Sequence, residues 1–263
     1  MSDSSNPDAR PDYGVDAPAV LRNLFLFGGL CLLLGTVLPP IVHLGNVALA
    51  VRPTFLWPAF FLLVEGCLYL LYVKWGKFRH RDRMLALHSW SGNERVLDVG
   101  CGRGLLLAGA ALRVKALKGN GHVTGIDIWS NEDMGGNSEA ATLRNLEIEG
   151  VTQLTSLVSA PAQEMSFPGA SFDVVVSNLC LHNISSRSTR KEALQQIIRV
   201  TKPGGVALIS DYKNTGEYAK VFEELGLSVS KDRGGFFTTF PPLTIVVARK
   251  PFVTSQGWDA SNA

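Results

Sequence analysis

The stretch VLDVGCGRGLLL, residues 96–107, decides the fold, because an apolar run gives way there to glycines at every second position. The acid Asp98 precedes the glycines Gly100, Gly102 and Gly104. The apolar run predicts a buried strand, and the apolar residues after the glycines predict a helix. Glycine lets the backbone come close to a ligand, and the N–H groups that open a helix favour an anion. The stretch therefore predicts a strand, a ligand-binding turn and a helix.

Strands and helices alternate outward from this turn. Strands rich in Val, Ile and Leu that alternate with helices indicate a Rossmann-like α/β fold, with a mostly parallel seven-stranded sheet and helices on both faces. No helical pattern separates the last two strands, so we expect those two to pair antiparallel. Strands are predicted at 95–100, 122–129, 154–160, 172–178, 206–212, 227–232 and 242–250, and helices at 105–118, 138–150, 191–200 and 218–225.

Two apolar stretches precede this α/β pattern. Residues 24–42 carry no charge, and residues 55–73 carry only Glu65. As helices, each is roughly 28 Å long, about the thickness of the hydrocarbon core of a bilayer. We expect two transmembrane helices; a re-entrant hairpin, favoured by Pro39-Pro40, and a signal peptide are the alternatives. Glu65 would be protonated, paired or turned toward protein, and Gly66 beside it indicates a close helix contact.

The basic residues predict the orientation in the membrane. KWGKFRHRDR, residues 74–83, carries five Lys and Arg, whereas the loop between the apolar stretches carries only Arg52. The positive-inside rule then places both ends of the hairpin, and everything after residue 74, in the cytoplasm. The basic stretch either ends the second helix or also lies against anionic headgroups. We therefore expect an integral, multi-pass membrane protein whose globular part faces the cytoplasm.

Composition bounds the domains and the partners. We expect a disordered leader over 1–19, a two-helix transmembrane hairpin over 20–74, a globular domain over 75–250 and a loose tail over 251–263. The net charge of +2 does not indicate a nucleic-acid partner. The four cysteines form no CxxC pair and no metal-like spacing with histidine, which fits a reducing compartment and predicts no metal site.

A second acid ends the next predicted strand, in GIDIW. Asp127 is placed there to accept hydrogen bonds from both hydroxyls of a ribose, and a hydrogen bond to a charged group is worth roughly 1.5–3 kcal/mol. Ile128 follows, where it can cover one face of a purine. A dinucleotide fingerprint GxGxxG would need glycine at position 105, where Leu105 stands. Asp98 is awkward for a pyrophosphate but suits a ligand that carries an ammonium group.

Four motifs together resemble the class I S-adenosylmethionine-dependent methyltransferases, and within them the ubiquinone/menaquinone-biosynthesis-like or type 11 group. The motifs are VLDVGCGRG (96–104), GID (125–127), SFDVVVSNLCLHNI (171–184) and RVTKPGG (199–205). The resemblance covers residues 83–250. It implies a methyltransferase domain with S-adenosyl-L-methionine as its cofactor.

The resemblance also implies a role for each matching residue. The turn from Gly100 through Gly102 to Gly104 would hold the methionine end of the cofactor, and Asp98 would support the ammonium group directly or through water. Asp127 would bind the ribose hydroxyls. Ile128 would pack on the adenine, and Asn178 and Leu179, at the end of the fourth strand, would line the pocket beside the transferable methyl.

The chain departs from the family before the fourth strand. The family usually has an acid there that meets the adenine amino group, and in APAQEMSF the residue Pro161 takes its place. The backbone N–H of Ala162 would still meet the adenine ring, with Gln163 as a substitute for the lost acid.

The acceptor end has a thinner signature, because methyl transfer mainly aligns the donor and the acceptor. A base is needed only if the acceptor must lose a proton. His182 is the best-placed base, and a hydrogen-bonded structural histidine is the alternative. Asp211 and Tyr212, after the fifth strand, are expected in the pocket wall. Candidate covers are residues 130–138, 184–190, 234–242 and the membrane-proximal lead-in.

The sequence thus predicts a membrane-anchored S-adenosylmethionine-dependent methyltransferase that acts on a small acceptor. A lipophilic acceptor, such as a quinone, an isoprenoid or a lipid, would suit the membrane hairpin. The alternative, raised by Pro161 and by the lack of an obvious base, is a catalytically degenerate cofactor-binding domain that acts as a membrane scaffold. Leu105 argues against a nicotinamide dehydrogenase. The expected partners are the small-molecule or lipid-like acceptor and the membrane.

Overall fold

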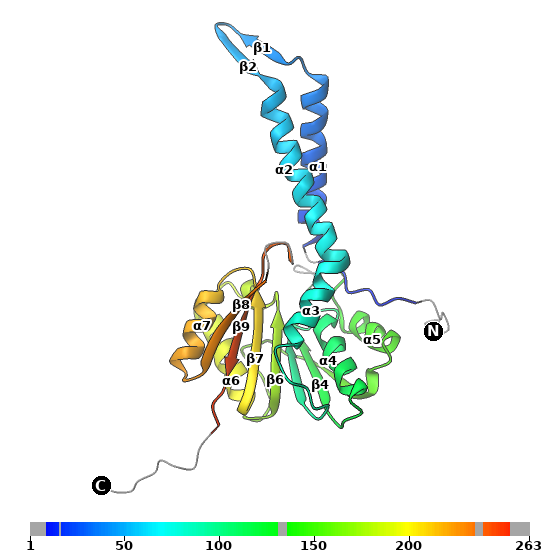
Figure 1. Cartoon of the computed structure of the whole chain (residues 1–263), viewed down its shortest axis with the longest axis vertical. Helices are drawn as coiled ribbons and strands as arrows, with labels where there is room; N and C mark the ends of the chain where they lie inside the picture. Colours follow the sequence, from blue (N-terminus) through cyan, green and yellow to red (C-terminus); the bar gives the residue numbers. More distant parts are fainter. Residues whose placement is uncertain (1–8, 16, 131–135, 235–238, 253–263) are drawn as a thin grey trace, which may run out of the picture.

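A helical stalk stands on a sheet domain in the computed structural model, which describes residues 9–15, 17–130, 136–234 and 239–252 (Figure 1). A π-helix joins α2 to α3 without a break, so that one helical segment leads from the stalk into the domain. The elements of this part are α1 (Pro18–Val37), β1 (Ile41–Leu44), β2 (Val47–Ala50), α2 (Val51–Leu71), the π-helix η1 (Tyr72–Gly76) and α3 (Lys77–Leu85).

The domain is built on a seven-stranded sheet with the strand order β5-β4-β3-β6-β7-β9-β8. The first five strands of this order run parallel, and β9 runs antiparallel to both β7 and β8. The predicted Rossmann-like sheet and its antiparallel end are therefore confirmed. The strands are β3 (Arg95–Val99), β4 (His122–Asp127), β5 (Thr155–Ser159), β6 (Phe172–Asn178), β7 (Thr201–Asp211), β8 (Ser228–Arg233) and β9 (Thr244–Arg249).

Helices cover both faces of the sheet (Figure 1). Val174 and Val176 of β6 pack with α3 and α4, whereas Val175 packs with α6 and α7. Because both faces are buried, the central strands need apolar residues at every position, which explains their continuous Val and Ile runs. The helices are α4 (Leu105–Ala116), α5 (Glu139–Ile148), α6 (Arg187–Val200) and α7 (Thr215–Glu224), with short 3-10 turns η2 (Thr152–Leu154) and η3 (Leu181–Asn183).

The strand order places a ligand crevice between β3 and β6. From β3 the chain continues to β4 and β5 on one side, and then returns to β6 and β7 on the other. The connections leave these two neighbouring strands in opposite directions, which opens a crevice at their carboxyl ends. The predicted glycine turn follows β3 and therefore lies at this crevice.

Several predicted boundaries differ from the structure, and two of them are wrong by five residues. The first stalk helix ends at Val37 rather than at residue 42, because Leu38 is extended ahead of Pro39-Pro40. The following residues pair as the β1–β2 hairpin, with Ile41 opposite Ala50, which the sequence analysis missed. The strand expected at 206–212 begins earlier, since β7 starts at Thr201, which pairs with Phe172 before a shift in register.

The two stalk helices pack through glycine. A Cβ added at Gly28 would lie 2.9 Å from the Cγ of Leu63, and one at Gly66 would lie 3.1 Å from the ring of Phe25. Small residues let helix backbones approach closely inside a membrane. The close contact expected at Gly66 is thus present. Glu65, however, is exposed on the stalk rather than turned toward protein.

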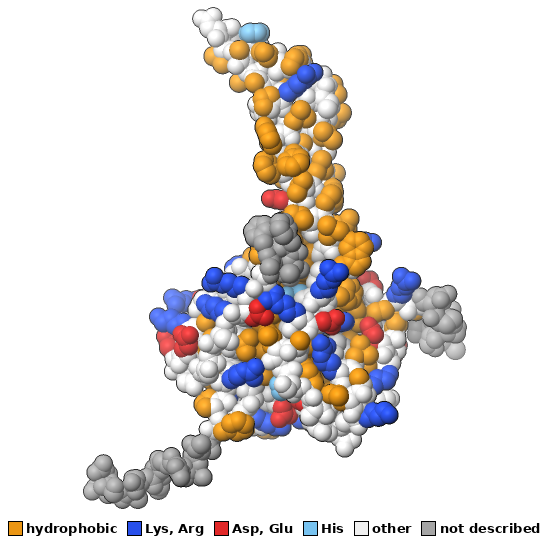
Figure 2. Space-filling model, viewed as in Figure 1, with side chains coloured by type: hydrophobic (Ala, Val, Ile, Leu, Met, Phe, Trp, Pro, Cys, Tyr) orange, Lys and Arg blue, Asp and Glu red, His pale blue; other side chains and the backbone are white. Residues whose placement is uncertain are grey.

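The stalk presents many apolar side chains on the face seen in Figure 2. Leu26, Phe27 and Phe61 are each more than half exposed. Two helices, Pro18–Val37 and the one that begins at Val51, are long and apolar enough to cross a membrane; only 11% and 22% of their apolar windows are buried inside the protein. A core helix of a soluble protein would bury most of such a surface.

The described part of the leader, residues 9–15, packs on the domain, contrary to the disorder expected from its composition. Tyr13 is 4% exposed, and its hydroxyl donates a hydrogen bond of 2.7 Å to Glu149. The Lys77 ammonium donates to the backbone oxygens of Tyr13 and Gly14 at 3.2 and 2.6 Å. A single buried aromatic ring therefore anchors a segment that is otherwise polar. Residues 1–8 and 253–263, also expected to be loose, lie outside the described residues.

The leader also contacts the glycine turn. The Arg103 guanidinium lies 2.8 Å from the carboxylate of Asp12. The side-chain amide of Asn145 donates to the backbone oxygens of both Asp12 and Arg103, at 2.9 and 2.8 Å. The chain that enters the stalk is thus tied to the turn that follows β3.

We predict that Tyr13→Ala lowers the free energy of unfolding by about 3 kcal/mol, as the loss of a buried aromatic ring usually does. Tyr13→Phe keeps the ring and loses only the bond to Glu149, which should cost about 1 kcal/mol. Thermal melting of the full chain in detergent measures both changes. Two equal and small shifts would show that the leader contributes nothing to stability.

Candidate functional site

The glycine turn after β3 is shaped by a close approach of two segments. Gly100 has a φ of 70°, and a Cβ added there would lie 2.2 Å from the Sγ of Cys180, which follows β6. Any side chain at this position would meet both the strained backbone and this neighbour. Gly104, with a φ of 85°, is the N-cap of α4. The turn therefore aims the free N–H groups of α4 at the crevice.

Asp98 lies beneath the turn as a buried acid. It is 1% exposed, and its Oδ2 has no hydrogen-bond partner among the described residues. Burial, and to a smaller extent the charge of Asp127, raises the pKa of Asp98 to about 8. The backbone N–H of Leu107 bonds the carboxyl and opposes part of this rise. A buried oxygen without a partner is costly, so the Oδ2 of Asp98 is arranged to receive a hydrogen-bond donor or a cation.

Asp127, at the end of β4, is held in a fixed orientation. Its Oδ2 accepts a hydrogen bond of 2.8 Å from the backbone N–H of Gly102. Its Oδ1 accepts from the Trp129 N–H at 2.7 Å and from the Asn137 amide at 3.2 Å. These bonds connect the glycine turn to β4, and Asp127 still borders the cavity described below.

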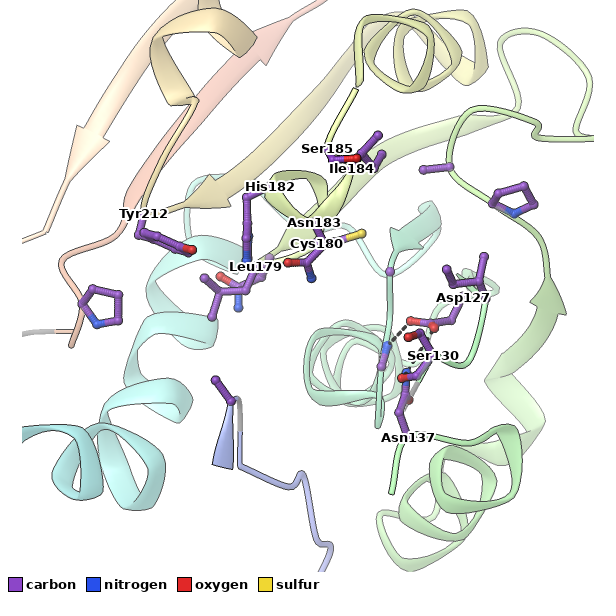
Figure 3. A pocket seen from close by; sticks show the side chains of 18 of the residues that line it. Asp127, Ser130, Asn137, Leu179, Cys180, His182, Asn183, Ile184, Ser185 and Tyr212 are labelled. Carbon is purple, nitrogen blue, oxygen red and sulfur yellow. Dashed lines mark hydrogen bonds between the residues drawn. The ribbon is translucent and has the colours of Figure 1, made fainter. Parts of the chain in front are cut away.

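One cavity of about 800 Å³ opens at the carboxyl ends of β3, β4 and β6 (Figure 3). Its size is typical of a small-molecule site. Of the predicted site residues, the cavity brings together Gly100, Gly102, Asp127, Ile128, Ala162, Asn178, Leu179, His182 and Tyr212.

Three predicted residues lie outside the lining of the cavity. Asp98 is beneath the turn and Gly104 begins α4, so each reaches the cavity only through its neighbours. Asp211 is fully buried behind His182, and the expectation that it forms the pocket wall is therefore wrong. Tyr212, the next residue, does line the wall.

The adenine end of the predicted site has an apolar wall. Ile128 is 63% exposed at the cavity edge, which is unusual for an isoleucine in this domain and leaves its face free for a flat apolar group. Pro161, Ala162 and Gln163 line the opposite stretch. Pro161, which replaces the usual acid, thus faces the cavity itself.

His182 and Asp211 form a pair at the other end of the cavity. The Nδ1 of His182 lies 2.9 Å from the Oδ1 of Asp211, although the two are not aligned as a hydrogen bond. The His182 ring packs edge-on against Tyr212, with 4.7 Å between the ring centroids. Figure 3 shows His182 and Tyr212 on the side of the cavity away from Asp127.

The base of the stalk forms the roof of the same cavity, which the sequence analysis did not foresee residue by residue. Val20 and Leu24 of α1 line it, together with Tyr69 of α2 and Tyr72 of the π-helix. Tyr69 and Tyr72 also pack in one cluster with Leu179. No spacing in the sequence relates these residues to the glycine turn. Their only signal is a pair of tyrosines three residues apart at the end of an apolar run.

The predicted covers also contribute to the cavity where they are described. Asn137 comes from the first cover, Ser185 from the second and Phe240 from the third. Residues 131–135 and 235–238 of these covers lie outside the described residues.

Comparison with known proteins agrees with this geometry. Residues 97–209 match the family model of a methyltransferase domain. With the sheet order and the glycine turn, this match supports a class I S-adenosylmethionine-dependent methyltransferase domain around the matched residues.

Two curated relatives illustrate the match. An uncharacterized methyltransferase of Mycobacterium tuberculosis is 32% identical over 135 residues, which are 51% of this chain and 59% of that protein. The ubiquinone/menaquinone biosynthesis C-methyltransferase UbiE of Vibrio campbellii is 32% identical over 119 residues, or 45% of this chain and 41% of that protein. The chain covers less than two thirds of either relative, so the similarity applies to the domain.

Solved structures share the fold at low identity. The N-methyltransferase NodS of Bradyrhizobium japonicum, in complex with S-adenosyl-L-homocysteine, has a TM-score of 0.53 at 15% identity and covers 67% of this chain and 88% of that one. The [4+2]-cyclase SpnF has a TM-score of 0.54 at 17% identity, with 66% and 82% covered. At such identities the likeness shows the fold alone.

S-adenosylmethionine is the cofactor of this domain class, and the residues present fit it. The free Oδ2 of Asp98 suits the ammonium group, and the N–H groups at the start of α4 suit the carboxylate. The carboxylate of Asp127 suits ribose hydroxyls, and the exposed face of Ile128 suits adenine. When bound, the cofactor supplies the methyl group on a sulfonium.

We predict that the protein releases roughly one proton when it binds S-adenosylhomocysteine near pH 7. Because the pKa of Asp98 is raised to about 8, the free protein holds this carboxyl mostly protonated, and an ammonium group beside it expels the proton. Titration calorimetry in two buffers of different ionisation enthalpy measures the release. The Asp98→Asn variant should bind S-adenosylhomocysteine more weakly and release no proton. Equal binding enthalpies of the native protein in the two buffers would contradict this role of Asp98.

We also predict that Asp127→Ala weakens S-adenosylhomocysteine binding by about 10- to 100-fold, which corresponds to one or two charged hydrogen bonds. Calorimetry on the full chain measures the affinity. Asp173→Ala is the control, since Asp173 lies near the start of β6 and bonds Arg95 and Lys202 instead. Unchanged affinity for Asp127→Ala would exclude it as the ribose ligand.

Proposed function

We propose that the protein is a membrane-anchored S-adenosylmethionine-dependent methyltransferase that acts on a small, lipophilic acceptor. One observation carries the proposal: the base of the apolar stalk forms the roof of the cavity that Gly100, Gly102 and Asp127 also line. An acceptor that diffuses in a bilayer would meet this cavity directly at the foot of the stalk.

The anchoring rests on the surface of the stalk. Trp57 and Trp75 are each about 60% exposed and lie 18 positions apart, roughly 27 Å along a helix. Aromatic belts occupy the two interfaces of a bilayer at about this separation. Lys and Arg gather on the domain around the foot of the stalk (Figure 2), as the positive-inside rule requires of a cytoplasmic domain.

The residues at one end of the cavity would bind the cofactor. Gly100, Gly102 and Gly104 would hold the methionine end, with Asp98 at the ammonium group, and Asp127 would bind the ribose. The adenine would lie between Ile128 and residues 161–163, which line the same cavity.

The methyl group would then point toward the stalk. Asn178 and Leu179, at the end of β6, would lie beside it, and His182 and Tyr212 would border the acceptor. The apolar roof formed by the stalk excludes water from this end, which favours an in-line displacement at the methyl carbon. In this arrangement residues 20–74 serve as both the anchor and a wall of the site.

We predict that Leu24→Trp lowers methyl transfer at least tenfold, because the larger ring fills the acceptor end beneath the roof. The measurement is transfer of label from tritiated S-adenosylmethionine into a chloroform–methanol extract of bacterial membranes, by the full chain in lipid nanodiscs. Leu33→Trp is the matched control, since Leu33 is 57% exposed on the stalk. Binding of S-adenosylhomocysteine should stay within threefold for both variants.

Two results would overturn the proposal. Equal transfer by the Leu24 and Leu33 variants would show that the roof does not border the acceptor. Tight binding of S-adenosylhomocysteine without transfer to any extract would favour the scaffold alternative, to which Pro161 at the adenine end gives its one structural support.

A further inference from the structure

We infer that His182 and Asp211 act together as a general base, and that the acceptor atom is the oxygen of a neutral hydroxyl group. This inference rests on the proposed function and adds the chemical class of the acceptor to it. His182 would contact the acceptor, and Asp211 would position the imidazole and stabilise its charge.

The surroundings of Asp211 are built to hold a carboxylate beside the imidazole. Asp211 is fully buried at the end of β7. Its Oδ1 accepts a hydrogen bond of 2.8 Å from the backbone N–H of Tyr212. Its Oδ2 accepts from the backbone N–H of His182 and from the Tyr218 hydroxyl, each at 3.2 Å. Burial, followed by the charge of Asp211, raises the pKa of Tyr218, so this tyrosine donates its proton and does not lose it.

The ring of His182 is left available on its other edge. Nδ1 is buried and faces Asp211, and the ring makes no hydrogen bond within the described part of the chain. The ring borders the cavity, so its Nε2 is the nitrogen that an acceptor can reach. A neutral imidazole with one nitrogen facing a carboxylate can accept a proton at the other nitrogen. Contacts of catalytic groups often align fully only when substrate is bound.

The charge of the cavity selects the class of acceptor. Among the described lining residues, Asp127 is the only carboxylate, and it lies at the cofactor end; no Lys or Arg lines the wall. The Asp211 carboxylate is buried behind His182, so among the described lining residues an alkylammonium acceptor would find no carboxylate at this end of the cavity. A neutral amine can attack a methyl group without a base. A hydroxyl group is neutral and needs its proton removed, which is the task that His182 and Asp211 can perform.

Methyl transfer to the hydroxyl group would be a single displacement. The hydroxyl oxygen attacks the methyl carbon, and the bond from that carbon to sulfur breaks with its electron pair on sulfur. The hydroxyl proton passes to Nε2 of His182, and the imidazolium lies against the Asp211 carboxylate. The products are a methyl ether and S-adenosylhomocysteine, and His182 then returns its proton to solvent.

The test uses the full chain in nanodiscs with the same tritiated cofactor and membrane extract. His182→Asn should lower kcat by about 10²- to 10⁴-fold, and Asp211→Asn should lower kcat with KM unchanged. Binding of S-adenosylhomocysteine should stay within threefold in both. Added imidazole should restore part of the rate to His182→Gly, which a structural histidine would not allow. His122→Asn is the matched control, because His122 begins β4 outside the cavity.

Mass spectrometry of the labelled product identifies the methylated atom, and we expect an ether oxygen. A methyl group on nitrogen or carbon would overturn the acceptor class. Normal kcat in His182→Asn, or no rescue by imidazole, would overturn the base. These failures differ from failure of the proposed function, in which the native protein binds S-adenosylhomocysteine but labels nothing in the extract.

Discussion

The docking of the stalk on the carboxyl edge of the sheet is the constraint on which the site depends. Tyr69 and Tyr72 pack in one cluster with Leu179 at the end of β6 and with Leu243 ahead of β9. Because α2 continues through the π-helix into α3 without a loop, the stalk keeps a fixed direction relative to the sheet. A π-helix is rare and often lies at a functional site, and here it delivers Tyr72 to the cavity. The apolar helices of the stalk are thereby also a wall of the cavity.

The cavity has two chemically distinct ends. Acids and backbone N–H groups gather around the glycine turn, where Asp127 holds the N–H of Gly102 and Asp98 keeps an oxygen free. The far end has apolar residues of the stalk above it and one histidine in its wall. Such a gradient suits a reaction between a charged, polar donor and a neutral acceptor that carries an apolar tail. Val20 and Leu24 give the roof its apolar surface at this end of the cavity.

The leader also connects the stalk to the glycine turn. The Asp12 carboxylate pairs with Arg103 in the glycine turn, and Asn145 bonds the backbone of both segments. The chain therefore touches the cofactor side of the domain immediately before it turns into α1. The leader thus supports the glycine turn from the side on which α1 begins.

Local sequence determined the sheet, its antiparallel end and the cofactor half of the cavity, because each rests on short-range patterns. Apolar runs give the strands, and the order of parallel strands brings the residues at their ends, such as Gly100 and Asp127, to one edge. Tertiary structure alone decided the rest. The packing of Tyr13, the burial of Asp211 behind His182 and the stalk roof over the cavity join residues far apart in the chain. Such contacts depend on where whole helices dock, which no local periodicity encodes.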